Sequence, residues 1–551
     1  MKLFKRLMAV MFALTLTLGM GTRVYAAEGD HTITITNESN DEVGKHTYEA
    51  YQVFTGELVV KDGKKVLSNI DWGNGVNGNA VLNAVKEDTE TFGDDAANVK
   101  NAADVAKLLG NFADESPAAK KFAAIVGEHL GTIAGQSIES KAPYTISVTG
   151  DGYYFVKDSA TLPSDTDPSE PHKGDAQTRY ILQVVADVSV GAKTGTVESK
   201  KKVQDINDST ESAVGSLQDS ADYDIGDNIP YTLTFKLPHN YTDYKTYAVS
   251  FVDDISAGLT FNEDAKIYYG ATDNTGESIT FTKSGMVWTA EIADLKALTS
   301  EKAKALTNDD VITIKYTAKL NERAVIGSAG NPNTYHVVYS NNPNGTGTGT
   351  TPEDKNIVFT YQVTVNKIDP AKEGTDKSLK GANFTLYKKV VQDADGNYPQ
   401  GSDTGANFKK GFAPNVKADA LVATDHYIVV SNRTGDATGS TFTFKGIDDG
   451  TYVLVETTIP AGYNAWDAVK FDVVAEHQTD AAEPQLTKLT GGDLVSGDFK
   501  DTGIIITSIE NKSGSTLPST GGIGTTIFYV LGGLLVAGAG IVLVARKKAA
   551  E

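Results

Sequence analysis

Short stretches in which apolar and polar residues alternate are the main pattern of this 551-residue chain. Alternation with a period of two is typical of a strand that buries one face and exposes the other. Polar turn residues separate these stretches, as in a fold made of many short strands. The pattern predicts strands at residues 31–35, 48–54, 144–148, 152–156, 180–190, 231–237, 247–252, 279–282, 311–320, 335–339, 359–368, 383–388, 441–444, 450–456 and 504–509.

A helical pattern interrupts the strands early in the chain. Residues 80–86, 102–112 and 116–130 are rich in Ala, Leu and Lys. In the last segment Ser116 suits the cap position and Pro117 the first helical position. A helix there would place three apolar side chains on one face, namely Phe122, Ile125 and Val126. We therefore predict strands with a helical insertion in this part of the chain.

The strands group into three predicted domains, a number that the chain length also favours. We place the domains at residues 27–195, 196–358 and 359–512. Residues 341–355 are rich in Gly, Thr and Pro and are predicted to be a linker. The predicted fold class is mainly β, with tandem β-sandwiches and a helical insertion in the first domain.

Both ends of the chain carry apolar segments of different kinds. Near the C-terminus, residues 523–545 are 23 residues without charge, enough for one membrane-spanning helix, and Arg546, Lys547 and Lys548 follow. At the N-terminus, basic residues precede the shorter apolar segment 7–18. This order is typical of a secretory signal peptide, predicted at residues 1–26 with cleavage after Ala26. The chain between the two segments is predicted to lie outside the cell.

Charge and composition narrow the range of functions. The formal net charge is −21, which argues against nucleic acid or an anionic surface as the partner. There is no cysteine, so an exported chain of this length needs core packing or another cross-link in place of disulfides. We find no HExxH, GxSxG or phosphate-loop motif, and residues 393–397 (DADGN) are read as a turn rather than a calcium loop. We expect no cofactor, no metal and no conventional enzyme.

The residues directly before the C-terminal apolar segment form a short motif. They are Leu517, Pro518, Ser519, Thr520 and Gly521. The motif resembles the LPxTG cell-wall sorting signal of Gram-positive surface proteins. The resemblance implies that residues 513–551 are a sorting signal, that a sortase cleaves between Thr520 and Gly521, and that the membrane helix is a transient anchor.

The third predicted domain contains a longer set of motifs. They are residues 381–388 (GANFTLYK), 444–447 (FKGI), 450–457 (GTYVLVET), 460–463 (PAGY) and 509–512 (IENK). This set resembles the E-box and flanking strands of Cna B-type domains in sortase-assembled pilins, whose fold is an immunoglobulin-like sandwich. The resemblance implies an intramolecular isopeptide bond between Lys367 and Asn511, promoted by Glu456.

The implied chemistry is consistent with the physics of burial. A lysine amine has an ordinary pKa of ~10.4 and is protonated and unreactive at neutral pH. Burial disfavours the charged forms of both lysine and glutamate. A neutral Lys367 amine could then attack the Asn511 carboxamide while Glu456 moves protons as ammonia leaves. The alternative is that Lys367 and Asn511 are exposed residues at a sheet edge.

The second predicted domain offers a similar set. Residues 251–255 (FVDDI) and 333–343 (NTYHVVYSNNP) resemble the middle domain of backbone pilins. There the acid would be Asp253 and the asparagine Asn333. The lysine lies within residues 199–203 (SKKKV). Alternation places Lys201 on the face of Val197 and Val203, which leaves Lys200 and Lys202 in solvent. An ordinary basic strand start is the alternative.

A polymerising pilin also needs a nucleophile for joining subunits. In the family a pilin motif of the Val-x-Val-x-Pro-Lys type carries this lysine between the first two domains. The matching residues 188–193 here are VSVGAK, which makes Lys193 the candidate acceptor. Ala192 stands where the family usually has proline. The alternative is a solvated linker lysine.

Together these features predict the backbone subunit of a covalent pilus on the cell surface. The expected partners are other copies of the chain, a class C sortase, a housekeeping sortase with peptidoglycan, and minor pilins. A host receptor would be a further partner that the sequence does not identify. The alternatives are a wall-anchored adhesin or minor pilin, which does not need Lys193, and a wall-anchored hydrolase, for which no catalytic motif is found.

Overall fold

The computed structural model describes twelve stretches of the chain, which group into two compact units. The first unit comprises Met1–Asn207, Val214–Thr360 and Glu476–Thr487, and the second comprises Asp208–Ala213, Tyr361–Ala475 and Lys488–Glu551. The predicted Ala26 cleavage site, Lys193 and the motif from Leu517 to Gly521 lie outside the described residues. The described residues are 30–37, 46–61, 64–113, 116–140, 142–159, 177–184, 186–192, 197–210, 215–343, 346–393, 395–514 and 523–549.

The first unit begins with two sheets that share a small core. In the three-stranded sheet, β1 is central, antiparallel to β5 and parallel to β8. The five-stranded sheet has the order β3-β2-β6-β7, with β4 beside β2. The bounds are β1 (Asp30–Asn37), β2 (Tyr48–Lys61), β3 (Lys64–Trp72), β4 (Gly135–Gln136), β5 (Tyr144–Thr149), β6 (Gly152–Asp158), β7 (Arg179–Val184) and β8 (Val188–Ala192). Ile33, Ile146 and Tyr154 are fully buried in this core, as the alternation in β1 and β5 predicts.

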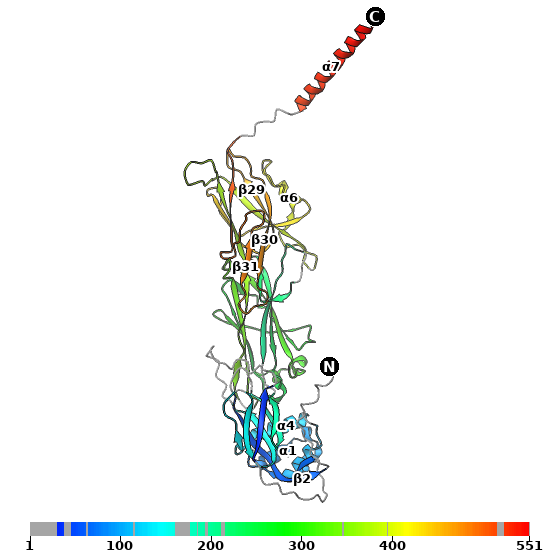
Figure 1. Cartoon of the computed structure of the whole chain (residues 1–551), viewed down its shortest axis with the longest axis vertical. Coiled ribbons are helices and arrows are strands. Elements are labelled where there is room, and N and C mark those ends of the chain that lie inside the picture. The colour runs from blue at the N-terminus through cyan, green and yellow to red at the C-terminus, as the bar shows by residue number, and fades with distance from the viewer. Residues whose placement is uncertain are drawn as a thin grey trace. The chain divides into compact units, whose positions relative to one another are not determined.

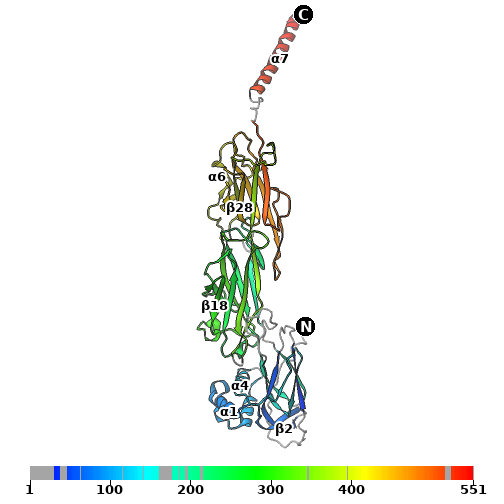
Figure 2. The same ribbon diagram turned by 90° about the vertical axis from the view of Figure 1, so that its left-hand side faces the viewer.

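The helical insertion forms a second core in the same part of the chain (Figure 2). Ser116 caps the last helix with its hydroxyl, which accepts a hydrogen bond from the Ala119 amide at 3.2 Å, and Pro117 opens it. Phe122 is fully buried and stacks on Phe54 of β2. The helices are α1 (Gly78–Glu87), α2 (Thr89–Phe92), α3 (Ala102–Leu109) and α4 (Pro117–Glu128), with the 3-10 turn η1 (Asp94–Asn98). The predicted insertion is confirmed.

The first unit continues as a sandwich of two seven-stranded sheets. One sheet has the order β10-β9-β12-β19-β15-β16 with β14 beside β19, and the other β11-β22-β20-β13-β18-β17 with β21 beside β20. The bounds are β9 (Glu198–Gln204), β10 (Leu217–Gln218), β11 (Ser220–Asp222), β12 (Asn228–Lys236), β13 (Val249–Ile255), β14 (Leu259–Phe261), β15 (Lys266–Tyr269), β16 (Glu277–Ser278), β17 (Thr282–Ser284), β18 (Val287–Ile292), β19 (Val311–Leu320), β20 (Asn331–Ser340), β21 (Thr348–Thr350) and β22 (Asp354–Phe359), with α5 (Glu301–Lys304), η2 (Tyr241–Asp243) and η3 (Leu295–Ala297).

The second unit contains another sandwich, labelled by β29 and β30 in Figure 1. One sheet has the order β27-β28-β23-β32, in which β23 and β32 are parallel, and the other β25-β26-β24-β29-β30-β31. The bounds are β23 (Tyr361–Ile368), β24 (Asn383–Val390), β25 (Asp403–Thr404), β26 (His426–Val429), β27 (Arg433–Thr434), β28 (Thr441–Ile447), β29 (Gly450–Thr458), β30 (Val469–His477), β31 (Leu486–Thr490) and β32 (Ile504–Glu510), with α6 (Gly405–Lys410). The predicted mainly β fold class is confirmed.

The C-terminal apolar segment is a helix. α7 spans Ile523–Ala549. Within it, Tyr529–Lys547 is long and apolar enough to cross a membrane. This agrees with the membrane helix predicted at residues 523–545.

Three sequence predictions about these elements were wrong. The predicted strand at 279–282 falls between two strands, because β16 ends at Ser278 and β17 begins at Thr282. The predicted strand at 180–190 is two strands, because the chain leaves the sheet of β6 after β7 and enters the sheet of β1 as β8. The predicted linker at 341–355 contains β21 and the start of β22, both of which pair with β20. Thr348, Gly349 and Thr350 are of types common in linkers, yet their backbone pairs with β20 and holds them in the sheet.

Candidate functional site

The strand β23 places Lys367 inside the sandwich of the second unit. Side chains along β23 alternate between buried and half-buried, and Val363, Val365 and Lys367 belong to the buried set. Asn511 follows β32 directly, and β32 is the parallel neighbour of β23 with Lys367 opposite Ile509. Glu456 comes from β29 in the facing sheet. These elements bring the amine, the carboxamide and the carboxyl group to one place in the core.

The three side chains are in direct contact. Lys367 Nζ donates to Asn511 Oδ1 at 2.6 Å and lies 3.2 Å from Glu456 Oε1. The same carboxyl oxygen accepts a hydrogen bond from Asn511 Nδ2 at 2.8 Å. The other oxygen of Glu456 accepts from the Trp466 amide at 2.8 Å, which fixes the carboxyl group. Lys367 is 0%, Glu456 1% and Asn511 2% exposed.

The surroundings favour a neutral amine at Lys367. Burial lowers the pKa of Lys367 below its ordinary value of 10.5, and the nearby Glu456 carboxyl group opposes that shift. The ring of Phe384 lies 5.4 Å from Nζ and completes an apolar wall. Because Nζ touches the oxygen of the Asn511 carboxamide, it lies next to the carbon that a neutral amine would attack.

The sandwich of two seven-stranded sheets in the first unit, from here on called the middle sandwich, contains a second buried lysine. On β9, Lys201 and Val203 are buried, Lys200 is exposed and Lys202 is half-buried. Lys200 pairs with Glu198 at the surface, and Lys202 pairs with Asp219. Of the three lysines that the sequence left open, Lys201 is therefore the one inside the core.

Lys201 contacts an acid and a tyrosine. Its Nζ donates to Asp253 Oδ1 and, at 3.0 Å, to the Tyr316 hydroxyl. That hydroxyl donates to Asp253 Oδ2 at 2.5 Å and accepts from Asn333 Nδ2 at 2.8 Å. Lys201, Asp253 and Asn333 are all 0% exposed. Asp253 lies on β13 and Asn333 on β20, so the sheet that faces β9 supplies both groups.

Burial also sets the protonation states of the middle cluster. It lowers the pKa of Lys201, an effect that the Asp253 carboxyl group opposes. It raises the pKa of Tyr316 well above 10.0, and the Asp253 charge adds to this shift. Tyr316 is therefore a neutral hydroxyl that can donate one proton and accept others. Sequence reasoning missed Tyr316, because it lies on β19, away from every motif.

Burial of a lysine is not specific to these two clusters. Lys388 on β24 is also 0% exposed, and it pairs with Asp448 at 2.5 Å and with Asp208. Both of these contacts are ion pairs with carboxylates, whereas the clusters of Lys367 and Lys201 also contain the carboxamides of Asn511 and Asn333. The distinguishing feature of the two candidate sites is therefore the combination of lysine, acid and asparagine.

Comparisons with known proteins match two parts of the chain to family models. Residues 361–487 match a prealbumin-like fold domain of the SpaA type. Residues 509–551 match an LPXTG cell wall anchor motif. The domain that holds Glu456 and Lys367 and the segment with the LPSTG motif are thus recognised independently of each other.

Two curated proteins are similar to the chain over part of their length. One is the trypsin-resistant surface T6 protein of Streptococcus pyogenes serotype M6, 27% identical over 59% of this chain and 65% of that protein. The other is fimbrial subunit type 1 of Actinomyces viscosus, 33% identical over 18% of this chain and 16% of that protein. The chain thus matches less than two thirds of the length of either relative.

Solved structures of pilins are also similar. The T6 backbone pilin of Streptococcus pyogenes is 16% identical, with a TM-score of 0.45, over 89% of this chain and all of that one. The full-length major pilin SpaD of Corynebacterium diphtheriae is 18% identical, with a TM-score of 0.45, over 90% of this chain and all of that one. The chain thus carries a SpaA-type prealbumin-like domain and an LPXTG cell wall anchor motif, and the two curated proteins it resembles are a surface protein and a fimbrial subunit.

Proposed function

We propose that the chain is the backbone subunit of a covalent pilus and that two internal isopeptide bonds stabilise it. The observation that carries the proposal is the pair of buried clusters that each hold a lysine, an acid and an asparagine. The three groups are in direct contact around Glu456, whereas the Tyr316 hydroxyl links Lys201 and Asp253 to Asn333. The LPSTG motif supplies the joint between subunits. In this function the protein is a structural element and a sortase substrate, and its chemistry on itself occurs once per bond.

In the third domain one carboxyl oxygen of Glu456 is suited to carry the proton. It lies 3.2 Å from Lys367 Nζ and 2.8 Å from Asn511 Nδ2. The neutral amine attacks Cγ of Asn511, and Glu456 takes a proton from Nζ and passes one to Nδ2. The bond from Cγ to Nδ2 breaks and ammonia leaves. The products are a secondary amide between Lys367 and Asn511 and one ammonia molecule.

In the middle domain the proton would travel through two groups. Asp253 contacts Lys201 Nζ through one oxygen and the Tyr316 hydroxyl through the other. Tyr316 in turn contacts Asn333 Nδ2. We infer that Asp253 accepts the proton of the attacking amine while Tyr316 gives its proton to the leaving nitrogen and regains one from Asp253. The balance is again one amide formed and one ammonia released.

The joint between subunits would form between Thr520, at the C-terminal end of the extracellular chain, and Lys193, between the first two predicted domains. A class C sortase would break the Thr520–Gly521 bond and hold Thr520 as a thioester, and Lys193 of the next subunit would displace the sortase to form an amide. The contact is head-to-tail and does not close, so it produces a fibre. A housekeeping sortase would join the last subunit to peptidoglycan, and minor pilins would occupy special positions.

The test of the joint is mass spectrometry of polymerised fibres together with one variant. A branched peptide that joins Thr520 to Lys193 is expected after digestion. Lys193→Ala should abolish the high-mass ladder of wall extracts, because the acceptor amine is gone. Lys200→Ala is the matched control, since Lys200 is an exposed lysine close in sequence, with 57% of its side chain exposed.

Two outcomes would contradict parts of this proposal. A ladder that persists in the Lys193→Ala variant would show that another lysine is the acceptor. A single wall-bound species in the unmodified strain, without any ladder, would favour a singly anchored adhesin or minor pilin. The isopeptide bonds are tested separately by the intact mass of the chain.

A further inference from the structure

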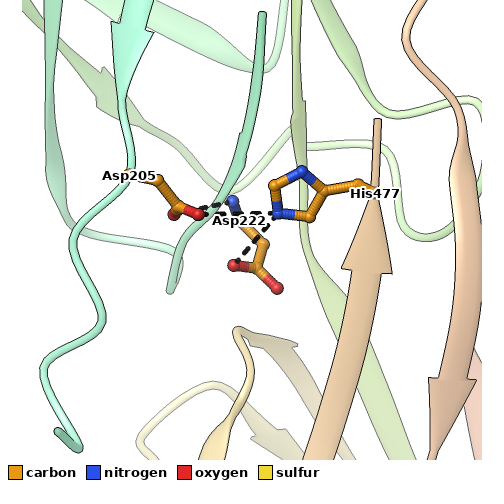
Figure 3. A group of neighbouring side chains, drawn as sticks. All are labelled: Asp205, Asp222 and His477. Atoms are coloured by element: carbon orange, nitrogen blue, oxygen red, sulfur yellow. Dashed lines mark hydrogen bonds and ion pairs between the residues drawn. The ribbon is translucent and has the colours of Figure 1, made fainter. Parts of the chain in front are cut away.

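Three polar side chains from distant parts of the sequence converge within the first unit (Figure 3). Asp205 follows β9, Asp222 ends β11 and His477 ends β30. The segment Glu476–Thr487, which carries His477, belongs to this unit. The side chain of His477 is 8% and that of Asp222 4% exposed, so the group is largely removed from solvent. Asp205 is partly accessible, with 26% of its side chain exposed.

The hydroxyl of Ser220 fixes the tautomer of His477. Ser220 Oγ lies 2.6 Å from the carbonyl oxygen of Gln478 and 2.7 Å from His477 Nδ1. A carbonyl oxygen only accepts, so the single hydroxyl proton of Ser220 points to Gln478. Ser220 must then accept a hydrogen bond from Nδ1, which therefore carries the ring proton. In the neutral imidazole, the lone pair is left on Nε2.

That lone pair faces two carboxylates. His477 Nε2 lies 3.5 Å from Asp205 Oδ2 and 4.0 Å from Asp222 Oδ1. Dashed lines in Figure 3 mark these contacts. Both separations exceed the 2.7–3.2 Å of an ordinary N–H···O hydrogen bond. Ligands at ~2.0–2.2 Å from one shared cation stand at about 3–4 Å from each other. The donor atoms of all three residues lie within 4.8 Å of one another, which fits a common centre.

Neighbouring groups orient the carboxylate of Asp205 as outer partners do in metal sites. Gln218 Nε2 donates to Asp205 Oδ2 at 3.0 Å, and the amide of Asp222 donates to Asp205 Oδ1 at 3.4 Å. The bond from His477 Nδ1 to Ser220 is of the same kind, because metal-bound histidines usually donate their other N–H to a fixed acceptor. A cation placed between these three donors would therefore meet ligands that are already oriented.

We propose that Asp205, Asp222 and His477 bind a divalent transition-metal ion of the Zn²⁺ class. One imidazole nitrogen with two carboxylate oxygens suits Zn²⁺, whereas Ca²⁺ and Mg²⁺ prefer oxygen ligands alone. The ion would neutralise the two carboxylates, and a water molecule would complete the tetrahedron. The chain has no cysteine, so nitrogen and oxygen are the strong ligands that it can offer. This site stands independently of the proposed pilus function.

Binding of such an ion would fasten the segment Glu476–Thr487 to the ends of β9 and β11. The segment already contacts the middle sandwich through the Lys355–Glu483 ion pair at 2.7 Å and through the bond from the Ala481 amide to Asp219 at 3.0 Å. An ion that binds the folded chain and not the unfolded one stabilises it by mass action. The metal ion would therefore stabilise the folded chain reversibly, in addition to any stabilisation by the proposed isopeptide bonds.

The test is titration of the full chain, purified without a histidine tag, with ZnCl2 in a calorimeter at pH 7. We expect one equivalent of Zn²⁺ to bind and the melting temperature to rise with it, while CaCl2 or MgCl2 at the same concentrations produces no such binding. His477→Ala and Asp222→Asn should each weaken binding by at least roughly tenfold, the loss that even outer-shell changes cause. His31→Ala is the matched control, since His31 contacts one carboxylate, Asp151, at 2.9 Å.

A second measurement on the unmodified chain avoids any effect of the variants on folding. X-ray absorption at the zinc edge should show nitrogen and oxygen ligands with the scattering of one imidazole. Absence of Zn²⁺ binding, equal binding of Ca²⁺, a spectrum without imidazole, or unchanged affinity in the folded His477→Ala variant would each overturn the proposal. A protonated His477 between the two carboxylates would then be the cation in place of the metal.

Discussion

At the scale of single residues, the proposed bonds in the two lysine clusters would form with different proton carriers. Glu456 reaches both nitrogen atoms of its cluster with one oxygen. Asp253 has a shorter side chain, and the Tyr316 hydroxyl spans the remaining gap to Asn333. In the proposed reaction Asp253 would therefore need the Tyr316 hydroxyl to reach the leaving nitrogen, whereas Glu456 contacts that nitrogen directly.

Replacement of Glu456 tests the third-domain bond. Glu456→Gln keeps the shape of the side chain but cannot take the proton from Lys367, so the bond should not form. Relative to its own sequence mass, the variant should then have lost one ammonia fewer than the unmodified chain has. The free energy of unfolding of this domain should fall by roughly 2–5 kcal/mol, by analogy with the loss of a native disulfide. Glu510→Gln, at an exposed position on β32, should change neither quantity.

Replacement of Tyr316 tests the proton path in the middle domain. Tyr316→Phe keeps the ring that stacks on Tyr231 and removes the hydroxyl between Asp253 and Asn333. We expect the middle bond to form slowly or not at all, so that the chain retains one more ammonia in its intact mass. Tyr335→Phe is the matched control, because its hydroxyl bonds to the Thr234 carbonyl. Equal masses for the two variants would rule out a role for the Tyr316 hydroxyl.

At the scale of elements, the two bonds would join strands in different ways. Lys367 and Asn511 belong to neighbouring parallel strands, β23 and β32, and β32 lies at the edge of its sheet. Lys201 and Asn333 belong to facing sheets, since β9 and β20 lie in different sheets. The first bond would hold an edge strand in place, and the second would hold two sheets together.

The carboxylate of Asp273 holds the loop between β15 and β16 through several hydrogen bonds. Asp273 accepts from the amides of Tyr269 and Thr275 at 3.1 Å each and pairs with Lys302 of α5 at 2.6 Å. These donors hold the pKa of Asp273 well below its ordinary value of 3.8, and the hydrogen bond from Lys302 has the largest effect. A lowered carboxyl pKa stabilises the fold above pH ~4, and the stabilisation disappears as the pH falls through the folded-state pKa.

Asp273→Asn should therefore destabilise the middle sandwich in a pH-dependent way. We expect a loss of about 1–3 kcal/mol at pH 7, because an amide cannot serve the same donors. The difference from the unmodified chain should shrink steadily below pH ~4, because the carboxyl group of the unfolded chain is protonated there and that of the folded chain follows only at lower pH. Denaturant unfolding of both proteins between pH 2 and pH 7, in steps of about one unit, measures this difference. A difference that stays constant with pH would contradict the assigned role of the charge.

The sequence pattern predicted elements well where the two faces of a strand differ. β5 alternates strictly between buried and exposed side chains, and alternation on β9 pointed to Lys201 as the inward lysine. It could not reveal Tyr316, because the contact of Tyr316 with Asn333 depends on how two sheets pack. The Asp205, Asp222 and His477 group was out of reach for the same reason, since 255 residues separate the last two in sequence.

At the scale of the whole molecule, each of the two proposed isopeptide bonds would remove one ammonia, so the intact mass shows how many have formed. The unmodified chain should be lighter than its sequence mass by two ammonia molecules once the signal peptide is accounted for. The double variant Asp253→Asn with Glu456→Gln should have the full sequence mass. We also expect trypsin to cleave the double variant within its sandwiches faster than the unmodified chain under the same conditions, because the proposed bonds restrict local unfolding.

The parallel pairing of β23 and β32 has a mechanical consequence. Tension in a fibre would enter this sandwich at Tyr361 and leave it beyond Asn511. With Lys367 joined to Asn511, the force crosses to the exit after a few residues of β23, and residues 368–510 form a closed loop that carries no load. Surface turns within this loop could then change in length without adding load to the strands that bear the force, whereas Glu456 and the core residues of the loop are still needed for the bond to form. A sandwich built in this way separates the part of the chain that bears force from the part that faces the surroundings.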